Sequence, residues 1–157
     1  MRKGQIRRGL VEKEGQRDIP PHVPPISPED FLLFQRDENG NPRVFLLSWT
    51  DGEEGHVVEV LFDPRYFRHS PDGFEWGYGG SGPAELARYL TYGVARHIKL
   101  PRDQWDDLDY QLVKEKVVAC IPRNEGACPA REIYKVLGLP EDAQSGERGR
   151  ISGRGGA

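Results

Sequence analysis

The stretch FLLFQRDENGNPRVFLLSW, residues 31–49, decides the fold class of this chain. Two short apolar runs, residues 31–34 and 44–49, lie on either side of the dipeptide Asn39-Gly40. Asparagine and glycine adopt, at low cost, the positive φ angles that tight hairpin turns favour. The stretch therefore predicts a β-hairpin.

Further strands are expected on the C-terminal side of this hairpin. The apolar run at residues 57–62 follows the turn-forming residues 51–55, so it predicts a third antiparallel strand. Phe74, Trp76 and Tyr78 then alternate with other residues, which is the period of a strand with one aromatic face. These residues predict a fourth strand.

Three helices are expected after the strands. They run from Ser81–Pro83 onward, from about Pro101 or Asp103 to Ile121, and from Pro129 to Gly138. In the first, Leu86, Leu90 and Val94 recur at the spacing of one buried helical face, and Ser81 is expected to be its cap. Strands followed by helices predict an α+β fold, a small antiparallel sheet of about four strands packed by two to three helices, with flexible termini.

The chain divides by composition into three parts. Residues 1–28 form a basic and then proline-rich N-terminal arm, residues 29–140 the α+β domain, and residues 141–157 a flexible tail rich in glycine, arginine and serine. The five prolines of residues 19–28 predict an extended strap. We expect it either to lie over its own domain or to dock in a partner's aromatic groove.

Charge is distributed unevenly along the chain. Residues 1–17 contain six basic and two acidic side chains, and residues 141–157 contain three of each, so the net charge of −3 leaves −7 for the residues between. The basic arm is either a solvated terminus or a site of weak contact with nucleic acid. No element is suited to sequence-specific readout of bases.

The sequence predicts a cytoplasmic protein, in the host cytoplasm if it is phage-encoded. No apolar stretch is long enough to span a bilayer, and no signal-peptide core is present, so no membrane partner is expected. In that compartment Cys120 and Cys128 are expected to be reduced, and their spacing matches no zinc motif. We expect no metal and no cofactor.

The candidate functional segment is FEWGYGGSGP, residues 74–83. So many glycines disfavour both helix and strand, which indicates a need for close backbone approach or unusual φ angles. Gly79, Gly80, Ser81 and Gly82 stand before a predicted helix, where free N–H groups and the helix dipole favour an anion. The segment predicts either tight packing of the helix or contact with a ligand or partner, the latter through these four residues together with Trp76 and Tyr78.

Catalysis is the less favoured reading of the same segment. His69 and Glu75 lie on either side of a turn and form an alternative acid–base pair. Ser81 does not match the G-x-S-x-G nucleophile elbow, because its segment reads Gly79-Gly80-Ser81-Gly82-Pro83, and a capping role explains it with fewer assumptions. The sequence leaves open whether the protein is an enzyme and favours the view that it is not.

The segment GFEWGYGGSGPAELA, residues 73–87, resembles the hallmark of a family of small uncharacterised bacterial and phage proteins. DPR at residues 63–65, HSP at residues 69–71 and YQLVK at residues 110–114 extend the resemblance, which covers roughly residues 56–122. The family has no assigned activity. Its occurrence in phages and mobile elements implies an accessory role in host takeover or anti-defence.

Three functions follow as hypotheses. The first is a non-enzymatic accessory protein of phage or mobile-element type that binds a macromolecular partner, most simply a protein. The second is a protein that binds or cleaves a phosphorylated small molecule or nucleotide signal at residues 79–82. The third is a small structural component of a larger assembly. An exposed Trp76 or Tyr78 would favour the first hypothesis, and a concave pocket at Ser81 with an arginine nearby would favour the second.

Overall fold

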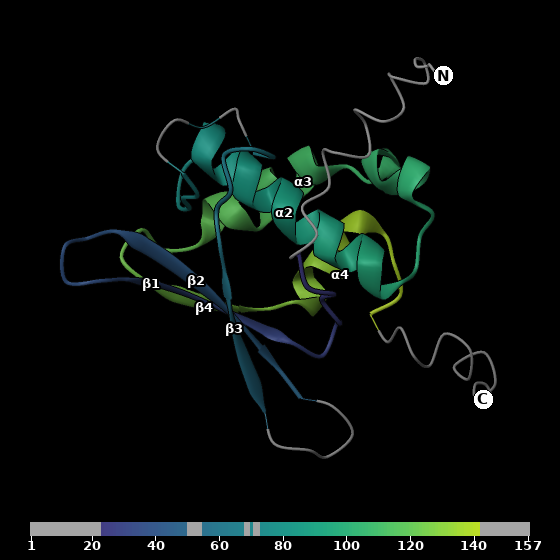
Figure 1. Ribbon diagram of the computed structural model, residues 1–157, viewed down its shortest axis with the longest axis horizontal. Helices are drawn as coiled ribbons and strands as arrows, with labels where there is room; N and C mark the ends of the chain where they lie inside the picture. The colour runs from purple at the N-terminus through teal and green to yellow at the C-terminus, as the bar shows by residue number, and fades with distance from the viewer. Residues whose placement is uncertain (1–22, 50–54, 68–69, 71–72, 142–157) are drawn as a thin grey trace, which may run out of the picture.

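The computed structural model describes residues 23–49, 55–67, 70 and 73–141. They form one four-stranded sheet with helices on one of its faces (Figure 1). The strands are β1 (Phe31–Arg36), β2 (Pro42–Ser48), β3 (His56–Val60) and β4 (Gly126–Pro129). The helices are α2 (Ser81–His97), α3 (Tyr110–Lys116) and α4 (Arg131–Leu137), with two 3-10 helices, η1 (Arg102–Asp107) and η2 (Val118–Cys120). The predicted α+β class is confirmed, whereas the predicted flexible termini lie outside the described residues.

The hairpin predicted from residues 31–49 is present as β1 and β2, which pair antiparallel. Within its turn, Gly40 alone has a positive φ, 83°. The Asp37 carboxylate closes the turn by accepting hydrogen bonds from the backbone N–H groups of Asn41 and Asn39, at 2.9 and 2.8 Å. The bond from Asn41 contributes most to lowering the pKa of Asp37. The turn is therefore fixed by a side chain as well as by glycine.

The prediction of a fourth strand at residues 74–78 is wrong. The sheet order is β3-β2-β1-β4, and its fourth strand, β4, pairs antiparallel with β1. Residues 74–78 instead turn at Gly77, which has φ 88° and donates its N–H to the Val118 carbonyl at 3.0 Å. The four residues of β4 show no apolar–polar alternation, so only the available edge of β1 makes them a strand.

The single helix predicted between residues 101 and 121 is also wrong in extent. The chain forms η1, α3 and η2 instead, because Leu108 has an extended backbone with ψ 136° and Val117 leaves the helical region at φ −121°. Asp109 caps α3, since its side chain accepts a hydrogen bond from the Leu112 N–H at 3.2 Å. Trp105, Val113 and Val117 nevertheless reach the core, whereas Cys120, near the end of the predicted helix, is exposed.

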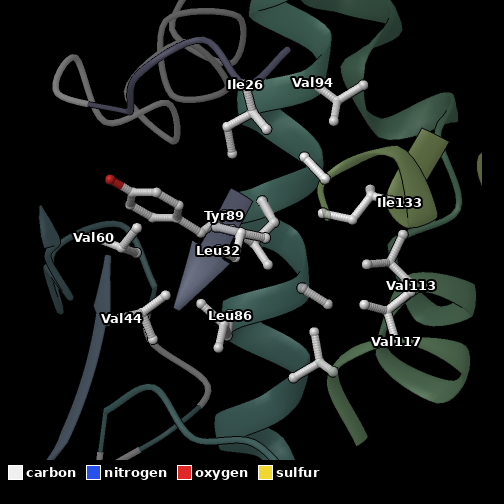
Figure 2. Close-up of a cluster of buried hydrophobic side chains, with 14 of the residues drawn as sticks. Ile26, Leu32, Val44, Val60, Leu86, Tyr89, Val94, Val113, Val117 and Ile133 are labelled. Carbon is white, nitrogen blue, oxygen red and sulfur yellow. The ribbon is translucent and has the colours of Figure 1, made fainter. Parts of the chain in front are cut away.

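Helix α2 lies at the centre of the core. Leu86, Leu90 and Val94 are all completely buried, as their spacing predicted. Figure 2 shows side chains of the sheet on one side of α2, namely Leu32, Val44 and Val60, and side chains of the C-terminal helices on the other, namely Val113, Val117 and Ile133. Contacts on both sides explain why α2 is the longest helix and the most buried.

The described part of the proline-rich strap lies over its own domain. Val23 and Ile26 belong to the buried core. The Ile26 N–H donates to the Gly93 carbonyl of α2 at 2.9 Å, and a Cβ at Gly93 would lie 2.9 Å from the Pro24 carbonyl oxygen. Glycine at position 93 therefore lets the strap reach the helix backbone.

The predicted third helix is confirmed as α4, which ends where Gly138 adopts a left-handed conformation with φ 74°. Within the described ranges, no helix is both long and apolar enough to cross a membrane.

Candidate functional site

Trp76 is a core residue. Its side chain is completely buried, its indole N–H donates to the Pro122 carbonyl at 2.9 Å, and its ring meets Phe34 of β1 edge-on at 5.4 Å between centroids. The Arg36 guanidinium covers the ring at 4.3 Å from its centroid. The structure therefore removes Trp76 from the predicted contact surface and gives it a packing role.

Glu75 is occupied by an ion pair. Its two carboxylate oxygens accept hydrogen bonds from the two terminal nitrogens of Arg36, at 2.8 and 3.1 Å. Arg36 also donates from Nε to the Arg123 carbonyl at 2.9 Å. Both side chains of the pair are about one-fifth exposed, 19% for Arg36 and 20% for Glu75. The proposed catalytic partner, His69, lies outside the described residues.

The glycines of the segment allow close packing at three points. At Gly82 a Cβ would lie 2.9 Å from the Glu75 Cβ and 3.1 Å from the Gly73 carbonyl oxygen, so the start of α2 rests on residues 73–75. At Gly80 a Cβ would collide with the Tyr78 ring, and at Gly77 it would collide with the Arg123 side chain. Gly79, in contrast, faces open space.

Ser81 does not cap α2. The residue at the cap position is Gly80, with an extended backbone at φ −115°, and no side chain accepts a hydrogen bond from the first turn. Ser81 is exposed as the first residue of the helix. The prediction failed by one position, because Gly80 is the residue that takes the extended conformation at the chain reversal.

Tyr78 is the exposed aromatic residue of the segment. Its side chain is 41% exposed, whereas Phe74 is 5% exposed and Trp76 is not exposed. The Arg123 guanidinium lies 5.0 Å from the centroid of the Tyr78 ring, and the ring lies over Gly80. The ring is thus held between a cation and the chain, with part of its surface facing solvent.

We call Tyr78, Gly79, Ser81 and Arg123 the Tyr78 surface; all four are exposed. Sequence reasoning identified the first three and missed Arg123, as well as the role of Arg36. Both arginines reach the segment from distant parts of the chain, 45 residues beyond Tyr78 for Arg123 and 39 before Glu75 for Arg36. No local signal in the sequence marks them.

A pocket in the structure is lined by residues on which α2 rests but not by the first residues of α2 itself. It has a volume of about 360 Å³, and its lining includes Val44 of β2, Val60 of β3 and Phe74, but no residue of 79–82. This pocket is therefore not the concave anion site that the phosphate-binding hypothesis requires at Ser81.

The two cysteines occupy different environments. Cys128 in β4 is buried and Cys120 in η2 is exposed, and both are free thiols. Burial raises the pKa of Cys128 to about 11, so this thiol is protonated and unreactive at neutral pH. In the described ranges, no three of the His, Cys, Asp and Glu side chains gather as metal ligands would.

A buried polar group lies where the strap enters the sheet. Asp30 is 3% exposed, and its carboxylate accepts a hydrogen bond from the Ser27 N–H at 2.8 Å. Burial raises the pKa of the Asp30 carboxyl group. Burial also lowers the pKa of His97, which lies near Asp30 at the end of α2. These groups fix the strap and lie far along α2 from Ser81, so they add nothing to the Tyr78 surface.

A comparison with protein-family models matches residues 36–138 to a family described as a family of unknown function, DUF6166. The match extends from the end of β1 to the end of α4 and therefore includes the whole 74–83 segment. A search of curated proteins and a search of solved structures each found no match.

Proposed function

We propose that this chain, which belongs to the family of unknown function DUF6166, is a non-enzymatic accessory protein that binds a protein partner through the Tyr78 surface. The resemblance of residues 73–87 to proteins of phages and mobile elements supports a role in host takeover or anti-defence. The observation that carries the proposal is the partly exposed Tyr78 ring, held between Arg123 and Gly80.

A tyrosine fixed in this way suits protein recognition. Tyrosine and arginine are enriched among the residues that dominate binding energy at interfaces. The ring already packs on Gly80 and against Arg123, so little side-chain entropy remains to be lost on association. The proposal therefore rests on a rigid aromatic anchor with a cation beside it.

The surroundings of Glu75 and Ser81, two residues that catalysis would need, support a non-enzymatic function. Glu75 is engaged in two hydrogen bonds with Arg36, so both of its carboxylate oxygens already have a partner within the fold. Within the described residues, no base is hydrogen-bonded to the Ser81 hydroxyl, so none of these residues activates it as a nucleophile.

Photo-crosslinking in cells tests the proposal. A photoreactive phenylalanine replaces Tyr78 in one variant and Arg131, an exposed arginine of α4, in a matched control. We expect a protein crosslinked from position 78 and not from position 131. With that protein purified, Tyr78→Ala should weaken binding by about 2 kcal/mol or more, the effect of a dominant interface residue, while Arg131→Ala leaves the affinity unchanged. Equal affinity of Tyr78→Ala and the parent chain contradicts the proposal.

The phosphate-ligand alternative has its own readout. Thermal melting is followed in the presence of nucleotides, cyclic oligonucleotides and inorganic phosphate, with Ser81→Pro as the variant. Proline suits the first helical position and only removes one N–H donor from the helix start. A melting shift seen with the parent chain and lost in Ser81→Pro would replace partner binding by anion binding. A constitutive assembly seen by sedimentation would instead favour the structural-component alternative.

A further inference from the structure

We propose that two copies of this chain form a weak dimer through the face of the sheet opposite the helices, with the two sheets packed face to face. We call this surface the open sheet face and define it by six outward-pointing apolar side chains: Phe31, Leu33, Phe45, Leu47, Val57 and Pro129. It shares no residue with the Tyr78 surface, and the inference does not depend on the function proposed above.

The strands alternate between the helical layer and the open sheet face. In β1, Leu32 and Phe34 are completely buried, so Phe31 and Leu33 point to the opposite face. The described helices lie on the buried side of the sheet (Figure 1). Antiparallel sheets with one face in solvent usually carry polar side chains on that face. Here the outward positions include a phenylalanine and a leucine on each of the two central strands, β1 and β2.

The outward side chains lie side by side without interruption. The strand register aligns one row across all four strands, in the order Pro129, Phe31, Leu47 and Val57. In the next row, Leu33 lies opposite Phe45. Phe31 is 39% exposed and Val57 is 67% exposed, so the described chain leaves this face partly open to solvent. A contiguous apolar surface of this kind is typical of a site of association.

Trp49 extends the open sheet face beyond the end of β2. It follows Leu47 by two residues, so its side chain continues on the same side of the chain. The side chain is 50% exposed. A Cβ at Gly55 would lie 2.9 Å from the indole nitrogen, so the ring lies against the backbone that leads into β3. A large aromatic surface is thereby held at the rim of the face and not in the core.

Charge favours a second copy over other occupants. Among the described strand residues, those that carry charge on this face are Arg43 and Glu59, and two hydrogen bonds of 2.9 and 2.7 Å join them. The pair is neutral as a whole, so it offers no excess charge to attract nucleic acid or an anionic membrane. Each copy brings one arginine and one glutamate, so a two-fold dimer can place Arg43 of each copy beside Glu59 of the other. The face is therefore complementary to itself in charge as well as in apolar character.

The dimensions of the face suit another sheet and predict weak binding. Four strands about 4.8 Å apart, over about six residues that each rise about 3.4 Å, cover about 400 Å². Two copies then bury at least about 800 Å², because side chains standing above the plane add to the flat area, and interfaces of this size are weak. Two sheets pack face to face about 10 Å apart, a space that facing layers of leucine and phenylalanine fill.

The first test is sedimentation equilibrium of the full-length chain between about 10 μM and about 1 mM, the range of dissociation constants expected for a weak interface. We expect a monomer at the lower concentration and a dimer at the higher one. Dissociation on dilution separates this dimer from the constitutive assembly of the structural-component alternative. A chain that stays monomeric over the whole range overturns the proposal.

A second measurement uses the parent chain and needs no substitution. Methyl NMR spectra are recorded during the same dilution. Signals of Leu33, Leu47 and Val57 should move with concentration, whereas those of Leu86 and Ile133, which are completely buried, should not. Changes confined to residues outside the open sheet face would assign the dimer to another surface and overturn the proposal.

Variants of exposed residues locate the interface. Phe31→Lys and Val57→Lys should each raise the dimer dissociation constant at least about tenfold, because the lysine replaces an apolar contact and each copy brings a like charge. Arg131→Ala and Tyr78→Ala are the matched controls and should leave the dissociation constant unchanged. Thermal melting of dilute samples checks that each variant is folded. Weakening by Tyr78→Ala, with neither lysine variant having an effect, would reject the open sheet face.

Discussion

Gly82 lies where the start of α2 crosses residues 73–75, and its missing side chain sets how closely they approach. The same is true of Gly77 against Arg123 and of Gly80 against Tyr78. Of the four glycines at positions 77, 79, 80 and 82, which suggested a ligand-binding loop, three therefore serve close packing. Gly79 is the exception, because it faces open space without a positive φ.

Gly82→Ala is predicted to destabilise the protein by about 1–3 kcal/mol, because the added methyl group meets the Gly73 carbonyl and forces a backbone shift. Urea unfolding measures the change. Gly79→Ala is the matched control and should change the free energy of unfolding by less than about 0.5 kcal/mol. A result in which the two variants are equally stable would show that the contact at Gly82 does not constrain α2.

The Arg36–Glu75 pair is predicted to be structural. In a double-mutant cycle built from Arg36→Gln and Glu75→Gln, the coupling free energy should be about 1–2 kcal/mol, as expected for a largely buried pair with two charge-assisted hydrogen bonds. Denaturant unfolding of the four proteins gives this quantity. Coupling near zero would mean that Glu75 is not committed to Arg36 and would reopen the question of its chemistry.

At the scale of elements, one arginine of α2, Arg88, joins this helix to the segment that follows β3. Arg88 donates from Nη2 to the Tyr66 carbonyl at 2.7 Å and from Nε to the Glu85 carboxylate at 3.0 Å. Its guanidinium also covers the Phe67 ring at 4.7 Å from the centroid. The arginine therefore ties the segment that follows β3 to the first half of α2, which explains why this irregular segment packs closely.

The last turn of α2 gives a prediction about pH. Burial lowers the pKa of His97 below its ordinary value of 6.5, and nearby Lys99 adds to this, although the Asp30 carboxylate opposes it. The unfolded chain thus binds a proton at a higher pH than the folded chain does. As pH falls from 6.5 toward the lower folded pKa, stability is lost, and above 6.5 this contribution is fully present.

The measurement is urea unfolding of the parent chain and of His97→Gln between about pH 8 and about pH 5, on either side of the ordinary histidine pKa. The parent should lose stability relative to the variant as pH falls. A difference that stays constant over this range would show that His97 titrates alike in the folded and unfolded states.

At the scale of the whole molecule, the strap joins parts that are distant in sequence. The Tyr134 hydroxyl of α4 donates to the Ile26 carbonyl at 2.6 Å, across 108 residues, and the Ile26 N–H donates to Gly93 of α2. Burial raises the pKa of Tyr134 well above its ordinary value, which is consistent with a protonated donor in the core. The strap, α2 and α4 are therefore fastened at one point.

Tyr134→Phe is predicted to reduce the free energy of unfolding by about 1–3 kcal/mol, because it leaves the buried Ile26 carbonyl without its donor. Tyr110→Phe, at a partly exposed tyrosine, is the control and should have little effect. Amide exchange at Ile26 gives a local readout and should quicken only in Tyr134→Phe. Unchanged exchange would indicate that the strap is held by apolar contacts alone.

Hydrophobic spacing and turn chemistry in the sequence determined the hairpin, the third strand, α2, α4 and the α+β class. These features are local, since an Asn-Gly turn or a four-residue apolar period acts within a few residues. The sequence also determined that the 74–83 segment is unusual, and it identified Tyr78 together with the glycines around it.

Only the tertiary structure decided which strand completes the sheet, because β4 is a strand through its pairing with β1 and not through its own composition. It also decided that Trp76 is buried beneath Arg36 and that Tyr78 is exposed beside Arg123, and both arginines come from distant positions in the sequence. Finally, it placed β3 at an edge beside a pocket. Long-range pairing and packing create these features, and no local pattern encodes them.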